Sequence, residues 1–175
     1  MKILTVTFLA LVMFGAFRMF EGETKPMNFE DTIKWIRDFT TMHGVTTSHG
    51  VVTQENKMIG AGGCDVQVTH DFICADKTAH SIKHTSLFIS LSDLDPTQVH
   101  FQAIHYEGDN FFRINFERTD SALKIKVTRV LGDDETVTED QSGDYLQFDS
   151  SESAEAFGKT LVHAIKLCGG KPAPL

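Results

Sequence analysis

The chain has 175 residues, of which 24 are acidic and 16 are basic, so its formal net charge is −8. A chain of this length is expected to form one domain with its own hydrophobic core. The acidic surface argues against a nucleic-acid partner, because phosphate binding requires a net basic face.

The first twenty residues have the pattern of an export signal. Lys2 is followed by an uncharged run over positions 3–17 and then by Arg18. This run is shorter than the about 20 apolar residues that a membrane span needs, which favours a secretory signal peptide. Ala16 suits the last position before a cleavage site, whereas Phe14 is large for the third position before it. Both a cleaved signal peptide and an uncleaved signal-anchor therefore remain open.

This pattern sets the expected organisation of the chain. We expect a signal peptide or signal-anchor at 1–20, a polar tether at 21–27, one globular domain at 28–170 and a short tail at 171–175. The protein is then exported, and it is periplasmic, secreted or anchored facing outward. It meets a membrane only through the N-terminal segment, if that segment is not cleaved.

A helix is expected over residues 28–42. Asn28 is a good N-cap, and Asp31 three residues later approximates a capping box. Apolar residues recur at helical spacing after the cap, at Phe29, Ile33, Ile36 and Phe39. Gly44 is a natural end for this helix, whose apolar face is expected to be core.

Between residues 45 and 148 the hydrophobic period changes to two, which is typical of β-strands. Apolar residues alternate with polar ones at Cys64, Val66 and Val68, and again at Leu87, Ile89 and Leu91. The glycines before Cys64 lead into a strand, so they lack the helix N-terminus of a phosphate-binding loop.

The turns predict a meander in the second half of this region. Gly108 and Asp109 suit a two-residue hairpin loop, which places Ala103 opposite Ile114 and Phe101 opposite Phe116. A second reversal at residues 119–120 places the strand 123–130 beside the strand 111–117. The expected pairs are then Phe116 with Leu123, Ile114 with Ile125, and Phe112 with Val127.

The same register brings three basic side chains together on the outer face of the meander. Arg113 lies opposite Lys126, and Lys124 lies beside Asn115 on the same face. Like charges directly opposite are mildly unfavourable in a sheet, so this strip is a candidate contact for a ligand or partner. The alternative is an ordinary solvated face whose charges are balanced by neighbouring residues.

The chain ends with an amphipathic helix over residues 151–168. Asp149 and Glu152 predict a capping box at its start. One apolar stripe follows, at Phe157, Leu161, Ala164, Ile165 and Cys168. Gly169 and Gly170 are expected to end the helix.

A run of antiparallel strands followed by one C-terminal helix resembles the pleckstrin-homology-like barrel, in which that helix plugs an open end. The segments FISLSDLDP (88–96) and SAEAFGKTLVHAIKLCGGK (153–171) are similar to uncharacterised bacterial exported proteins. The resemblance implies a mostly antiparallel β-meander or barrel with a C-terminal capping helix. The expected fold class is α+β, in which the N-terminal helix is an addition to the barrel pattern. A curved-sheet sandwich is the alternative fold.

Three cysteines in an exported chain allow one disulfide. Cys64 shares the inward phase of its strand, and Cys168 shares the inward stripe of the last helix, so a bridge between them is expected. A link between Cys64 and Cys74 is the competitor, and three buried free thiols are the third possibility.

No catalytic, metal or cofactor site is expected from the sequence. His80 and His84 have the spacing of a helical zinc pair, but their segment reads as strand or loop, where they would lie too far apart to share an ion. We therefore expect a non-enzymatic exported domain that binds a partner protein or a small ligand in the cell envelope. The alternative is a metal-binding protein or enzyme that uses histidines of the β-rich region.

Overall fold

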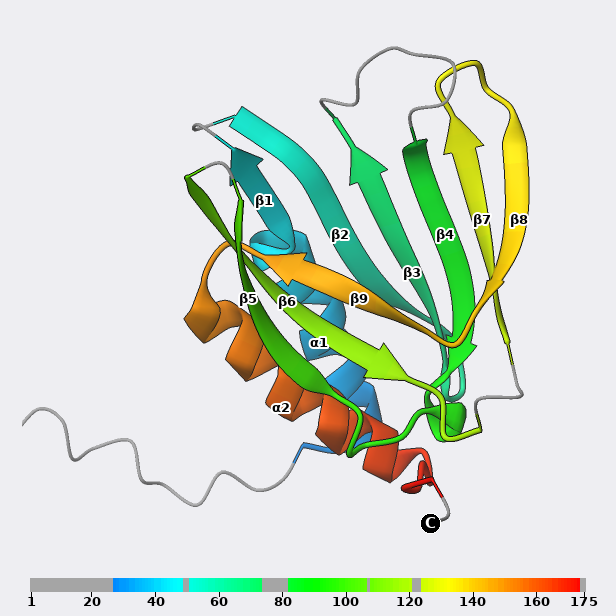
Figure 1. Cartoon of the computed structure of the whole chain (residues 1–175). Helices are drawn as coiled ribbons and strands as arrows, with labels where there is room; N and C mark the ends of the chain where they lie inside the picture. The colour runs from blue at the N-terminus through cyan, green and yellow to red at the C-terminus, as the bar shows by residue number, and fades with distance from the viewer. Residues whose placement is uncertain (1–26, 49–50, 74–81, 107, 121–123, 174–175) are drawn as a thin grey trace, which may run out of the picture.

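The computed structural model in Figure 1 describes residues 27–48, 51–73, 82–106, 108–120 and 124–173. Its elements in chain order are α1 (Phe29–His43), β1 (Val45–Ser48), β2 (Val51–Gly62), β3 (Asp65–Phe72), β4 (Ile82–Ser90), the short 3-10 helix η1 (Leu91–Asp93), β5 (His100–Tyr106), β6 (Asp109–Glu117), β7 (Ile125–Leu131), β8 (Thr136–Gln141), β9 (Gly143–Phe148) and α2 (Ser151–Leu167).

The strands form two antiparallel sheets, a larger one of order β1-β2-β3-β4-β7-β8 and a smaller one of order β5-β6-β9. The smaller sheet lies across the larger one, and α2 packs along the smaller sheet while α1 packs against α2 and β2 (Figure 1). The α+β class with mostly antiparallel strands is therefore confirmed. Within the described residues the two sheets do not join into a closed barrel.

The hydrophobic core lies between α2, the larger sheet and one face of the smaller sheet. Ile114, Phe116, Leu146 and Phe148 belong to this core. The α2 residues of the predicted stripe are buried against them, at Phe157, Leu161, Ala164 and Ile165. A Cβ atom on Gly158 would lie 3.0 Å from the Ile114 Cδ1 atom, so the glycine lets α2 approach β6 closely.

The hairpin of β5 and β6 forms where it was expected, but its register differs from the prediction by two residues. Phe101 lies opposite Ile114, where the prediction placed Phe116, and Ala103 is displaced in the same way. The reason is the turn, because Asp109 is already the first residue of β6. A shift of two residues keeps every side chain on its predicted face, since the faces of a strand alternate with period two.

The expected pairing of residues 123–130 with residues 111–117 is wrong. On that side β6 pairs with β9, so Phe116 lies opposite Asp144, whereas its expected partner Leu123 is outside the described residues. β7 lies in the larger sheet, between β4 and β8. Alternation indicates which residues share a face, and it does not tell which strand lies beside them.

The N-terminal helix has the predicted cap, since the side chain of Asn28 accepts a hydrogen bond from the Asp31 backbone N–H. Gly44 ends the helix as expected, but its φ of −76° is open to any residue. The requirement is space, because a Cβ atom on Gly44 would lie 2.1 Å from the Asn56 carbonyl oxygen.

The second helix is capped by Ser150, whose side chain accepts from the Ser153 backbone N–H, so the predicted capping box of Asp149 and Glu152 is wrong. The Asp149 carboxylate instead lies 2.8 Å from the His43 Nδ1 atom at the end of α1.

The described part of the expected tail is also held in place. The Thr119 hydroxyl donates to the Lys171 carbonyl, and the Ala173 N–H donates to the carboxylate of the buried Asp95.

The predicted disulfide is present in the structure. Cys64 and Cys168 are bonded, with their Cα atoms 5.8 Å apart and 104 positions between them in the chain. The bond links the turn before β3 to the C-terminal end of α2, so the strand phase and the helix stripe identified the correct pair. Cys74, the competing partner, lies outside the described residues.

Candidate functional site: a polar cleft between the sheets

A set of polar side chains lies where the smaller sheet faces the larger one. On β6 and β9 the face opposite to the hydrophobic core carries Arg113, Tyr145 and Gln147, because these residues alternate with the core residues of the same strands. Gln54 and His70 share a face of β2 and β3, as the cross-strand register shows. Side chains from both sheets meet here, so the site is a cleft built from strands distant in sequence.

Both ring nitrogens of His70 lie within hydrogen-bond distance of a side chain in this cleft. The Asn56 amide group donates to the Gly44 carbonyl at 3.0 Å and to the Gln147 carbonyl at 3.2 Å. The side-chain oxygen of Asn56 therefore faces the His70 Nδ1 atom, 2.7 Å away, and accepts a hydrogen bond from the N–H of that nitrogen. The other ring nitrogen, Nε2, lies 2.9 Å from the Asp144 Oδ2 atom.

The two hydrogen bonds define what His70 can do. Both ring nitrogens have a partner within the protein, and the residue is only 2% exposed. A general base needs a nitrogen that can reach the proton of a ligand. His70 is thus a positioning residue, which holds Asp144 and packs against the ring of Tyr145 at a centroid distance of 5.1 Å.

A second set of hydrogen bonds attaches β9 to the larger sheet. The Gln147 amide group donates to the Thr46 hydroxyl and to the Gln54 side-chain oxygen, both at 3.3 Å. Gln54 in turn donates to Asn56 at 2.7 Å. All four side chains are buried, so these bonds form in a medium where an unmade hydrogen bond is costly.

Arg113 is the basic residue of the cleft. Its Nε atom donates to the Gln147 side-chain oxygen, and its guanidinium carbon lies 4.2 Å from the centre of the Tyr145 ring. The three other described arginines pair with acids, Arg37 with Asp38, Arg118 with Asp93 and Arg129 with Glu139. Within the described part of the chain, no carboxylate forms an ion pair with Arg113.

Two hollows adjoin these side chains. The first has a volume of about 380 Å³ and is lined by Thr53, Gln54, Phe72, Ile104, Phe111, Arg113 and Gln147. The second has about 290 Å³ and is bordered by Tyr145 and Asp144 together with Arg129 of β7 and Gln141 of β8. The first hollow combines an apolar wall with one cation, and its size is at the lower end of small-molecule sites.

The structure separates the three basic residues that the sequence had grouped. Arg113 lies in the cleft, with Gln102 and Gln147 as its neighbours across the strands. Lys126 is an exposed residue of β7 in the larger sheet, opposite Asp140, and Lys124 is exposed just before that strand. The predicted basic strip is therefore not formed, since β6 and β7 are not paired.

The histidines of the described residues are dispersed. His43 and His84 each contact one aspartate, while His100 and His105 contact amide side chains. In the described ranges no three histidine, cysteine or acidic side chains come together as a group that could hold a metal ion. His80, half of the spaced pair, lies outside these ranges.

None of the described helices is both long and apolar enough to cross a membrane.

No protein-family model, curated protein or solved structure matches this chain.

Proposed function

We propose that this protein is a non-enzymatic binding protein that holds a small ligand in the cleft between its two sheets. The ligand has an anionic head group and an apolar body. The observation that carries the proposal is Arg113, a cation that lies beside an apolar wall and is held by Gln147 and Tyr145 rather than by a described carboxylate.

The cation fits the anionic head group of such a ligand, and the apolar wall fits its apolar body. A guanidinium group presents a planar set of N–H donors that matches a carboxylate or phosphate, and it keeps its charge at all relevant pH values. Phe72, Ile104 and Phe111 offer apolar surface next to it. The hydrogen bonds of Gln147 orient Arg113 before a ligand arrives, which reduces the entropy lost on binding.

The site belongs to a protein that we expect to act in the cell envelope. The apolar N-terminal run with its flanking Lys2 and Arg18 supports export. The Cys64–Cys168 bond supports it as well, since disulfides persist in oxidising compartments. The packing of a C-terminal helix on antiparallel strands supports the likeness to pleckstrin-homology-like proteins.

The test compares two probes of equal chain length, octanoate and octanol, by isothermal titration calorimetry. We expect octanoate to bind more tightly than octanol to the native protein. In Arg113→Gln the octanoate affinity should fall about 10-fold or more, because a hydrogen bond to a charged group contributes about 1.5–3 kcal/mol. The affinity for octanol should remain, which shows that the cleft is intact.

Lys126→Gln is the matched control, because it removes an exposed charge of the other sheet. It should leave both affinities unchanged. An equal loss in the two variants would mean that only the overall charge attracts octanoate. A native protein that binds neither probe would contradict the proposal.

A further inference from the structure

The described sheets have four edge strands, β1 and β8 in the larger sheet and β5 and β9 in the smaller one. The strand β9 lies against β1 and β2, and its Gln147 carbonyl accepts a hydrogen bond from the Asn56 side chain, which leaves β1, β8 and β5 as open edges. An edge strand presents unpaired backbone groups that another chain can bind, so proteins usually protect it with charges, bulges or short length. β1 has only four residues and an irregular register. β8 carries the exposed Glu139 and Asp140. Both β1 and β8 are therefore protected against pairing with a strand of another chain.

β5 has no such protection. It is seven residues long, has the sequence HFQAIHY, and contains no lysine, arginine, acid or proline. Its residues from His100 to Ala103 are exposed. The strand is thus long, uncharged and accessible.

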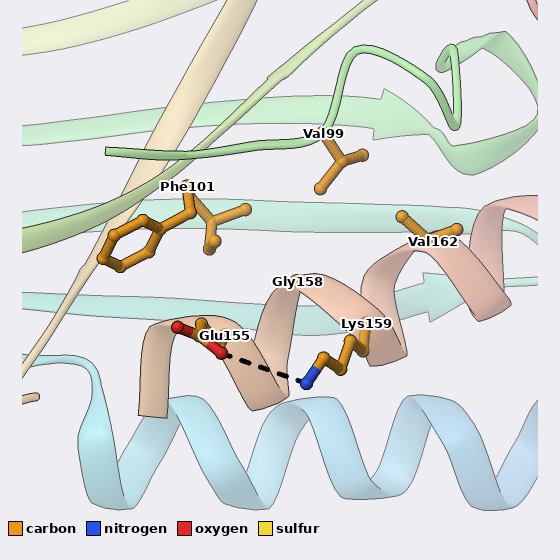
Figure 2. Close-up of a pocket in the computed structure, with 7 residues that line it drawn as sticks. Val99, Phe101, Glu155, Gly158, Lys159 and Val162 are labelled. Atoms are coloured by element: carbon orange, nitrogen blue, oxygen red, sulfur yellow. Dashed lines mark ion pairs between the residues drawn. The ribbon is translucent and has the colours of Figure 1, made fainter. Parts of the chain in front are cut away.

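An apolar groove lies directly beside this edge, between β5 and α2 (Figure 2). Its volume is about 380 Å³, and its walls are formed by Val99, Phe101, Ile114, Gly158 and Val162, with Glu155 and Lys159 at the rim. The two charged rim residues pair with each other at 3.9 Å, so they leave no net charge. Phe101 is 43% exposed, although it faces the groove.

We propose that β5 of one molecule pairs antiparallel with β5 of a second copy, so that the protein is a two-fold symmetric dimer. The absence of charge on β5 suits pairing with a second copy, because identical strands bring identical residues together across a two-fold axis. Two β5 strands meet without like charges, whereas two β8 strands would bring Glu139 and Asp140 of both acidic copies together.

The alternation of the strand also makes this edge self-complementary. A two-fold axis perpendicular to the sheet places the α2-facing side of β5 on the same side of the joined sheet in both copies. The residues of one copy that face α2 therefore lie beside the residues of the other copy that face its own α2. Phe101 and Ala103 of one copy then lie on the groove side of the other copy. The pairing covers an exposed aromatic ring with apolar surface, which stabilises the dimer.

The dimer leaves the cleft free. Gln102 and Ile104 point to the opposite face of β5, the face on which Arg113 and Phe111 lie. Joining the two smaller sheets through β5 gives one six-stranded sheet, with both clefts on the same face. This inference does not rest on the proposed ligand.

The test is the molar mass of the purified protein in solution, measured by light scattering over a range of concentrations. We expect twice the mass of one chain for the native protein, falling toward one chain on dilution. Ala103→Lys places a charge on the exposed edge and should give a monomer whose melting temperature matches that of the native protein when the native protein is diluted to the monomer. Thr138→Lys makes the same kind of change on β8 and should remain a dimer.

Three results would overturn the inference. They are a native protein that is monomeric at every concentration, an Ala103→Lys variant that dimerises like the native protein, and a β5 edge that is occupied by a co-purified foreign peptide. If Ala103→Lys fails to fold, hydrogen exchange of the native protein decides. The amides of residues 100–106 must then become more protected as the concentration rises, while those of 136–141 do not.

Discussion

The His70 Nε2 atom lies 2.9 Å from the Asp144 Oδ2 atom, although 74 positions separate the two residues in the chain. The contact joins β3 of the larger sheet to β9 of the smaller one at the edge of the cleft. Both side chains are nearly inaccessible, with 2% and 8% of their surface exposed. The arrangement of the two sheets, and with it the position of Arg113, therefore depends on a buried polar contact.

Replacing His70 should destabilise the fold strongly. His70→Leu leaves the buried Asp144 carboxylate without its partner, and we expect a loss of about 3–5 kcal/mol in the free energy of unfolding, measured by urea denaturation. Asp144→Asn keeps a polar group that can form a hydrogen bond with Nε2, so its cost should be only about 1 kcal/mol. His84→Leu is the control, since that histidine pairs with Asp71 at the surface. It should cost less than about 1 kcal/mol, and equal losses for the two histidines would contradict the account.

The stability should fall at acidic pH because of Asp95. Burial by itself raises the pKa of this carboxyl, but hydrogen bonds from Thr97 and from the Ala173 backbone outweigh it and hold the pKa below its ordinary value of 3.8. A carboxyl whose pKa is lower in the folded state stabilises the protein above pH 3.8, and this stability is lost as the pH falls through the folded-state pKa.

The variant Asp95→Ala should therefore be less stable than the native protein at neutral pH, by at least about 1.5–3 kcal/mol for the lost hydrogen bonds to a charged group. The difference between the two proteins should shrink below pH 3.8, as followed by thermal unfolding at several pH values. A difference that is constant with pH would show that Asp95 does not act through its charge.

Removal of the disulfide should destabilise the protein. The bond closes a loop of 104 positions, and a loop of this length is worth about 3–5 kcal/mol. The double variant Cys64→Ala/Cys168→Ala should show this loss, whereas Cys74→Ala should not, because Cys74 is not part of the bridge. Non-reducing peptide mapping gives the direct check. A Cys64–Cys74 peptide would refute the pairing.

Two phenylalanines of the smaller sheet test which of its strands is central and which is at the edge. Phe116 is fully buried, and Phe116→Ala should cost about 3–5 kcal/mol. Phe101 is 43% exposed at the edge of the sheet, so Phe101→Ala should cost clearly less in the monomer, about 1 kcal/mol. Chemical denaturation at low protein concentration compares the two. A larger loss at Phe101 would contradict the position of β5 at the exposed edge of the smaller sheet.

The parts of the fold that were predictable are those with a local cause. Asn28 caps α1 through its own side chain, and the stripe of α2 follows from helical spacing. The disulfide was predictable because the strand phase of Cys64 and the helix phase of Cys168 both point into one core.

Strand order was not predictable in this way. β6 and β7 are close in the chain and have the same alternation as a true hairpin, yet β9 takes the place beside β6. Leu146 and Phe148 satisfy the apolar face of β6 as well as the β7 residues would. Only the packing of the whole core decides between the two partners.

The cleft depended on the same long-range choice. Arg113 was identified as a contact residue, but through a strip with Lys126 that does not exist. Gln147 and Tyr145 carry no local signal in the sequence, because their role arises only when β9 lies beside β6 and faces β2.

The most direct test of the account is a two-dimensional NMR titration of the protein with octanoate. We expect the side-chain amides of Gln54 and Gln147 and the Arg113 Nε–H signal to shift with one common saturation curve, because these groups line the same hollow. The backbone amides of Gly158 and Val162, which line the groove on the other face of the smaller sheet, should not move. Shifts at Gly158 and Val162 with none at Gln54, Gln147 and Arg113 would contradict the claim that the cleft is the binding site.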